Sequence, residues 1–217
     1  MTAIRDALSK WPILSVVMTA MVALALGSTV GIMSARPAPD PGIDSPEAGF
    51  AWDMSLHHGQ AVTMSMHLYR NGGDETLRAL AYDIALTQQA QIGIMSSWLT
   101  EWELPATSTV EPMQWMDMPM DMGSWAEEGR LMPGMVTKAE LDELYSLSGT
   151  EADLLFCELM VGHHIGGVHM ADGILDLTEH PEVTRVAEAM VRGQQTEIDA
   201  LNGIAQRLMD TAQEKNG

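Results

Sequence analysis

Residues 50–64 read FAWDMSLHHGQAVTM, and residues 156–170 read FCELMVGHHIGGVHM. The second stretch repeats the first at an offset of 106 residues. The matched positions are Phe50 and Phe156, Met54 and Met160, His57 and His163, His58 and His164, Val62 and Val168, and Met64 and Met170. Both stretches share a histidine pair flanked by methionines, and the repetition indicates two related halves in one chain.

The repeat continues in the same register beyond the histidine pairs. Further matches are Gln88-Gln89 with Gln194-Gln195, Ile92 with Ile198, and Met95 with the apolar Leu201. Because no insertion interrupts this register, we interpret it as an internal duplication rather than a chance recurrence of two histidines. Each copy predicts one helical hairpin.

Apolar periodicity and capping signals predict an all-α fold. We expect helices over residues 46–70, 74–102, 137–147, 151–178 and 181–212. Ser45 is a predicted N-cap before Pro46, and Thr137 with Glu140 has the spacing of a capping box. Thr150 is placed to cap the next helix. The four long helices, two from each copy, predict a four-helix bundle over residues 46–212.

The domain organisation follows from these elements. Residues 46–105 form the first predicted hairpin and residues 150–212 the second. Between them, residues 106–149 form a methionine-rich connection that contains the short helix. Residues 36–45 form a proline-rich linker, which we expect to be semi-extended.

The N-terminal residues 1–35 predict a transmembrane anchor. Residues 11–33 carry no charge, and as a helix they are long enough to cross a hydrocarbon core of ~30 Å. Arg5 and Lys10 precede them, so the positive-inside rule places the N-terminus in the cytoplasm and the bulk of the chain outside. A cleaved signal peptide is the alternative, but its apolar region usually has ~7–15 residues. We therefore expect a single-pass protein of the cell membrane.

The composition is strongly acidic, with 30 acidic and 11 basic residues and a formal net charge of −19. Such a surface repels phosphate backbones, so we expect no nucleic-acid partner. Solubility explains the acidity most simply, and a field that concentrates cations is the alternative. The single cysteine, Cys157, cannot form an internal disulfide. We interpret it as a buried thiol, with a thiolate metal ligand as the alternative.

The histidine pairs predict a metal site. On each predicted helix, the first histidine of the pair and the two flanking methionines share one face. Imidazole and thioether ligands together suit copper, Cu(I) more than Cu(II), whereas calcium or magnesium would need oxygen ligands. The predicted ligands are Met54, His57, His58, Met64, Met160, His163, His164 and Met170.

A packed core with hydrogen-bonded histidines is the structural alternative, because methionines at helical spacing usually fill cores. Burying four imidazoles without partners would cost several kcal/mol, which favours metal binding. Either histidine of a pair can ligate, leaving the other to bond a neighbouring Glu or carbonyl. Gly162, Gly166 and Gly167 weaken the second motif helix, so they predict a close helix approach or room for a ligand.

A second methionine-rich stretch covers residues 113–122. It contains five methionines, Met113, Met116, Met118, Met120 and Met122, whose spacing does not fit one helical face. An extended loop would place several thioethers on one side, as a Cu(I) trap requires. A loop that packs its methionines on the bundle or on a partner protein is an equally supported interpretation.

These motifs resemble the family called domain of unknown function 305. The resemblance rests on the two Met-x2-His-His blocks and on the linking segment Met132-Pro133-Gly134-Met135, and it covers about residues 46–210. It implies a ferritin-like four-helix bundle outside the cytoplasm. Some members of the family are linked to copper binding and copper tolerance. By this resemblance, the eight histidine and methionine positions named above are the ones to carry over.

Two functional hypotheses follow. The first is a membrane-anchored copper-binding protein that stores, buffers or delivers Cu(I). The second is an accessory subunit of a membrane protein complex, such as a respiratory assembly with a copper-requiring oxidase. We expect no enzyme activity and no cofactor besides copper: the Glu-x2-His motif of di-iron bundles is absent, and no glycine-rich phosphate loop or nucleophile–base order stands out.

Overall fold

The computed structural model describes residues 40–116 and 129–216, and this part of the chain is helical without any strand. The helices are α2 (Pro46–Asn71), α3 (Glu75–Glu101), α5 (Lys138–Ser146), α6 (Gly149–Leu175) and α7 (Pro181–Asn216). The predicted all-α class is confirmed for these residues. The membrane span expected over residues 11–33 and residues 117–122 of the methionine-rich stretch lie outside them. Among the helices that are described, none combines the length and apolarity needed to span a bilayer.

Local signals place the starts of α2, α3 and α5. The Ser45 side chain accepts a hydrogen bond from the Ala48 N–H, and Asp74 does the same for α3. The capping box predicted at Thr137 and Glu140 is present, with both reciprocal bonds formed. These contacts satisfy backbone N–H groups that the first helical turn leaves unpaired.

The start of α6 differs from the prediction. The helix begins at Gly149, with Ser148 at the N-cap position and no capping side chain, so Thr150 is not its cap. Gly149 has a φ of +64°, a backbone conformation that glycine adopts without steric cost. The buried carboxylate of Asp153 accepts instead from the backbone N–H groups of Gly73 and Asp74. This carboxylate therefore joins α6 to the α2–α3 turn and does not cap α6.

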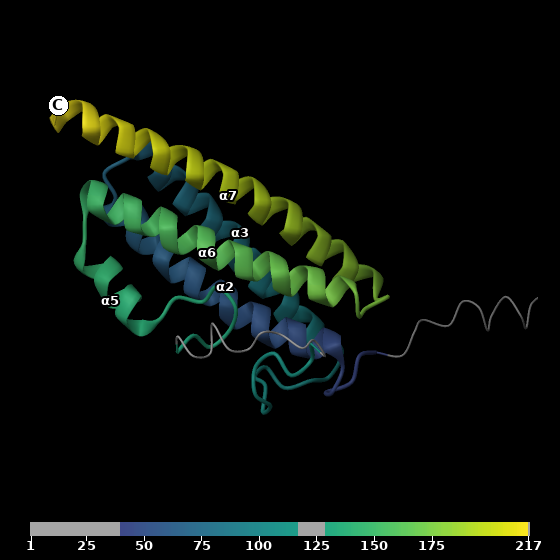
Figure 1. Cartoon of the computed structure of the whole chain (residues 1–217). Coiled ribbons are helices and arrows are strands. Elements are labelled where there is room, and N and C mark those ends of the chain that lie inside the picture. The colour runs from purple at the N-terminus through teal and green to yellow at the C-terminus, as the bar shows by residue number, and fades with distance from the viewer. Residues whose placement is uncertain (1–39, 117–128, 217) are drawn as a thin grey trace, which may run out of the picture. The chain divides into compact units, whose positions relative to one another are not determined.

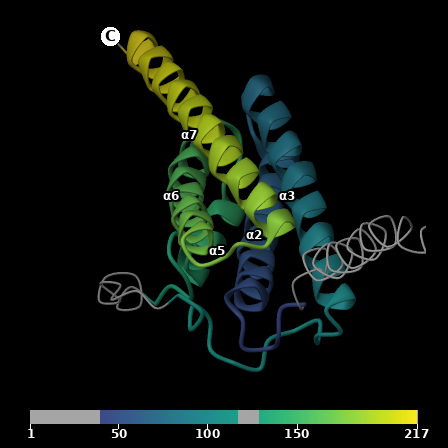
Figure 2. The same ribbon diagram turned by 90° about the vertical axis from the view of Figure 1, so that its right-hand side faces the viewer.

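The four long helices form two hairpins, α2 with α3 and α6 with α7 (Figure 1). The hairpins pack mainly through α2 and α6, and α5 lies against both of these helices. Figure 2 shows the two hairpins after a 90° turn. The helices that carry the two histidine motifs are thus the ones that contact each other between the hairpins.

The apolar core consists of two clusters, one toward each end of α2 and α6. The Phe50 cluster includes Met54 and Met170, and the Phe156 cluster includes Met64 and Met160. Members of the two clusters correspond at the 106-residue offset, for example Ile174 with Leu68, Val183 with Leu77, Ala187 with Ala81, and Met190 with Ile84. The internal duplication therefore appears in the packing as two related halves of the core.

Candidate metal centre

Buried polar side chains separate the two apolar clusters. On α2, His57 and His58 lie between Met54 of the Phe50 cluster and Ala61 of the Phe156 cluster. On α3, α6 and α7, too, buried polar side chains lie between residues of one apolar cluster and residues of the other. We call the resulting set the polar layer; its members are His57, His58, Gln88, His163, His164 and Gln194, all at most 4% exposed.

The duplication brings the four predicted histidines together in this layer. The ring centroids of His57 and His163 are 3.8 Å apart. His58 lies 6.4 Å from His57, and His164 lies 6.3 Å from His163. The four imidazoles therefore form a contiguous row across the contact between α2 and α6. His57 and His163, the first histidine of each pair, lie at its centre.

Burial keeps the imidazoles of His57, His58 and His163 neutral. It is the largest cause that lowers the pKa of His57 to about 4 and that of His58 to about 3. Burial and the neighbouring His57 hold the pKa of His163 well below its usual range. A neutral imidazole has a lone pair on one ring nitrogen, which is the form that binds metal ions.

Hydrogen bonds select the nitrogen that carries the proton on three of the rings. The Nε2 atoms lie 3.1 Å from the Pro133 carbonyl oxygen for His57, 2.7 Å from Gln91 Oε1 for His58, and 2.6 Å from Glu197 Oε2 for His164. A carbonyl or carboxylate oxygen only accepts, so each Nε2–H donates to it. In His57 and His58, which are neutral, the lone pair is then left on Nδ1.

The polar layer contains many buried polar atoms without a hydrogen-bond partner among the described residues. They are Nδ1 of His57, His58 and His164, both ring nitrogens of His163, and both amide atoms of Gln88 and Gln194. Each such group costs about 1–3 kcal/mol if it stays unpaired. A bound cation would use these lone pairs, so the donor chemistry of the layer fits a metal ion.

The eight predicted ligands are all buried but do not form one group. The structure brings the four histidines together and divides the methionines, with Met54 and Met170 in one apolar cluster and Met64 and Met160 in the other. Over residues 40–116 and 129–216, no three His, Cys, Asp or Glu side chains are arranged as a metal-ligand group. Available donors in the layer are therefore imidazole nitrogens and amide oxygens, flanked by thioethers.

Sequence reasoning missed Gln91 and Glu197, the side chains that orient His58 and His164. Their positions differ by the same 106-residue offset as the histidines. The sequence signal for them is the 106-residue offset itself, which relates two positions even where their residues differ. The expectation that one histidine of a pair bonds a Glu or a carbonyl agrees with the Glu197 and Pro133 contacts.

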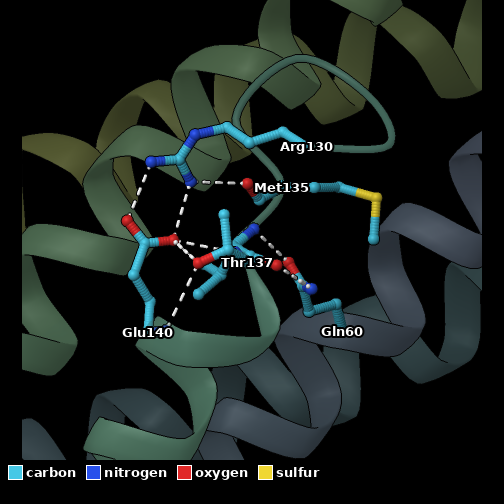
Figure 3. A network of polar contacts seen from close by, with 6 residues as sticks. Gln60, Arg130, Met135, Thr137 and Glu140 are labelled. Atoms are coloured by element: carbon cyan, nitrogen blue, oxygen red, sulfur yellow. Dashed lines mark hydrogen bonds and ion pairs between the residues drawn. The ribbon is translucent and has the colours of Figure 1, made fainter. Parts of the chain in front are cut away.

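A strap formed by residues 132–136 covers the polar layer beside α2 and α6. The Gln60 side chain bonds both the N–H and the carbonyl of Val136, at 2.6 and 2.8 Å. Arg130 donates to the Met135 carbonyl and forms an ion pair with Glu140, as Figure 3 shows. This anchoring holds the Pro133 carbonyl at His57.

Glycines allow the strap to approach the backbone of α6. A Cβ on Gly166 would lie 2.1 Å from the Pro133 oxygen, and a Cβ on Gly134 would lie 2.5 Å from the Gly162 oxygen. A Cβ on Gly167 would lie 2.3 Å from Gln194 Oε1. Two of the three predicted positions therefore serve close contacts: Gly166 with the strap and Gly167 with the polar layer.

Substitution of Gly166 by Ala is expected to lower the free energy of unfolding by about 1–3 kcal/mol, because the backbone of the strap must move away. Gly162→Ala is the matched control, since a Cβ there meets nothing within 4 Å. It should be neutral or stabilise by up to about 1 kcal/mol through helix propensity. Urea unfolding of both variants measures this difference, and equal stabilities would contradict the close contact.

The described part of the methionine-rich stretch packs on the bundle. Met113 and Met116 are buried in the Phe50 cluster. Asp53 holds this segment by accepting hydrogen bonds from the Met113 N–H and from Trp115 Nε1, and burial raises the pKa of Asp53. For these two methionines the packing interpretation is confirmed. Asp53 was not predicted, and its equivalent in the second copy is Leu159.

Cys157 lies in the Phe156 cluster and is 1% exposed. Burial raises the pKa of its thiol to about 12, so the thiolate form that binds metals is strongly disfavoured at neutral pH. The interpretation as a buried thiol is therefore supported.

Comparisons with known proteins agree with this architecture. The family described as Domain of unknown function (DUF305) matches residues 47–205. A crystal structure of a protein of this family from Streptomyces coelicolor is 42% identical, with a TM-score of 0.69, and covers 77% of this chain and 96% of its own. A structure of a DUF305 fragment from Deinococcus radiodurans is 31% identical to this chain, with a TM-score of 0.61. It covers 75% of this chain and 96% of its own.

More distant structures share the fold. CopM in its Cu(II)-bound form is 23% identical to this chain, with a TM-score of 0.55, and covers 75% of this chain and 97% of its own. No curated protein matches the sequence. The profile match over most of the chain and the 42% identity to a structure of the same kind show that this protein belongs to the DUF305 family.

Proposed function

We propose that this protein binds copper in the polar layer. The observation that carries the proposal is the row of four buried imidazoles whose Nδ1 atoms have no partner among the described residues. Three of these rings are held through their Nε2 atoms, so the direction of their Nδ1 atoms is set before any ion arrives.

The donor set favours copper over other cations. The layer supplies imidazole nitrogen, and the adjoining clusters supply thioethers from Met54, Met64, Met160 and Met170. Soft thioethers select Cu(I), whereas imidazole serves both oxidation states. Structures of CopM, which shares this fold, include Cu(I)-bound and Cu(II)-bound forms. This relation supports copper as the ion to test first.

In the proposed site the imidazoles provide the lone pairs, and the surrounding apolar clusters exclude water. The strap orients His57 through the Pro133 carbonyl. Because the His57 and His58 rings are already neutral, neither has to lose a proton when an ion binds. Bound copper would supply its positive charge and its affinity for nitrogen and sulfur donors. These properties serve storage, buffering or delivery of the ion.

We further propose that the protein acts at the outer face of a cell membrane. This part rests on the uncharged residues 11–33, preceded by Arg5 and Lys10, which fit a single-pass anchor with the bundle outside.

Copper titration of the full-length protein tests the binding proposal. His57→Gln with His163→Gln removes the two central rings and should lower the affinity for Cu(I) at least ~10-fold. His67→Gln is the control, because this histidine lies outside the polar layer and contacts Leu147 and Asn71 instead. Circular dichroism without metal checks that both variants fold. Equal copper retention in a folded double variant and in the control would refute the site.

A further inference from the structure

The two halves of the polar layer differ in charge at one matched pair of positions. Gln91 and Glu197 are separated by the 106-residue offset and contact equivalent histidines. Gln91 Oε1 lies 2.7 Å from His58 Nε2, and Glu197 Oε2 lies 2.6 Å from His164 Nε2. The contact geometry is conserved between the halves, while a neutral amide in one half is replaced by a carboxylate in the other.

Glu197 reaches the buried His164 ring from α7. The His164 side chain is fully buried, and the Glu197 side chain is 19% exposed. On α7, Glu197 lies one turn after Gln194, just as Gln91 lies one turn after Gln88 on α3. Among the residues that the structure describes, Glu197 is the one carboxylate hydrogen-bonded to an imidazole of the polar layer.

This difference has a direct consequence for a bound cation. A carboxylate that accepts the Nε2–H of an imidazole increases the basicity of the ring as a ligand. Its charge also attracts a buried cation, and a doubly charged ion gains about twice as much as a singly charged one. The neutral amide of Gln91 increases the basicity of its histidine ring less and attracts a cation less strongly. The carboxylate therefore favours Cu(II) over Cu(I) in its own half.

On the basis of the proposed copper site, we propose that Glu197 makes the two halves unequal. The His164 half is the stronger site for Cu(II), and Gln91 leaves the His58 half without that preference. In this proposal Glu197 is a positioning residue: it acts on the ion through His164 and sets the selectivity between oxidation states.

Reciprocal exchange of the two residues tests the proposal in the full-length protein. Cu(II) chloride and Cu(I) are titrated separately against competing chelators, and Cu(II) is also followed by electron paramagnetic resonance. Glu197→Gln should lower the affinity for Cu(II) about 10–100-fold and that for Cu(I) by a smaller factor. Gln91→Glu should raise the affinity for Cu(II). The double exchange should restore selectivity near that of the wild type, because it moves the carboxylate to the matched position.

Matched controls separate this effect from general charge or folding effects. Glu188→Gln removes one negative charge from the exposed face of the same helix, where it pairs with Arg192, and should leave copper selectivity unchanged. Thermal unfolding without metal should be similar for all variants, since Gln already occupies the equivalent place at residue 91.

The outcomes distinguish this inference from the function on which it rests. If wild-type protein binds copper but Glu197→Gln lowers both affinities equally, or neither, the role of Glu197 is refuted and the copper site stands. If the double exchange retains the selectivity of Glu197→Gln alone, the equivalence of the two halves is refuted. If wild-type protein binds no more copper than the variant lacking His57 and His163, the copper site itself fails.

Discussion

Acidification of the metal-free protein from pH 7 to pH 4 is expected to remove several kcal/mol of its free energy of unfolding. Burial lowers the pKa of His57 to about 4 and that of His58 to about 3. The unfolded chain protonates these rings near the usual value of ~6.5, so the unfolded state binds more protons than the folded state below that pH. Stability is therefore complete above about pH 6.5 and falls as the pH approaches 4. His57 alone accounts for about 3 kcal/mol at pH 4.

Urea unfolding in the presence of a chelator, repeated across this pH range, measures the loss. His57→Gln should reduce the dependence of the unfolding free energy on pH relative to the wild type. Burial raises the pKa of Asp53 and Asp153, which stabilises the folded state as the pH falls and partly opposes the histidines. For this reason the difference between His57→Gln and wild type is the decisive quantity. An unchanged pH dependence in His57→Gln would contradict the buried neutral imidazole.

Truncation of the matched phenylalanines should give the second large effect. Phe50 and Phe156 are both 0% exposed, each within its own apolar cluster. Phe→Ala at either position is expected to cost about 3–5 kcal/mol, from lost burial and the remaining cavity. Phe50→Ala should cost about 0.5–1.5 kcal/mol more, because Phe50 also packs edge-to-face on Trp115 at 5.8 Å.

Urea unfolding of the two single variants compares these losses. Trp115→Leu provides the control, since it removes the aromatic partner of Phe50 and has no counterpart contact at Phe156. In that background the costs of the two Phe→Ala changes should become similar. A larger cost at Phe156 than at Phe50 would contradict the contribution of Trp115, and unequal costs in the Trp115→Leu background would contradict the correspondence of the two clusters.

The fold was predicted well because its signals are local. Ser45 and Thr137 cap helices through residues three positions away, a spacing that sequence alone reveals. The start of α6 was predicted less well. Near that start, Asp153 contacts the turn at Gly73, 80 residues earlier in the chain. A contact over that separation has no signature in a short window of sequence.

The candidate site was predicted in part for the same reason. Helical spacing places a histidine on one face with its neighbouring methionines, and the repeat indicates that two such faces are related. The assignment of protons depends on partners from other elements: Pro133 on the strap for His57 and Gln91 on α3 for His58. The assignment of each methionine thioether to one of the two apolar clusters likewise depends on the antiparallel crossing of α2 and α6.

By itself, the sequence determined that this protein has two related helical halves, each with a histidine pair whose first member shares the interior face with the flanking methionines. Periodicity, capping residues and a constant offset depend only on the order of residues along the chain, so they can be recognised without coordinates. Only the tertiary structure decided that the four imidazoles meet in a single layer, that the repeated methionines separate into its two flanking clusters, and that Glu197 replaces Gln91 as a hydrogen-bond acceptor. Those relations arise when distant segments pack together, because packing brings side chains into contact that the order of the chain keeps apart.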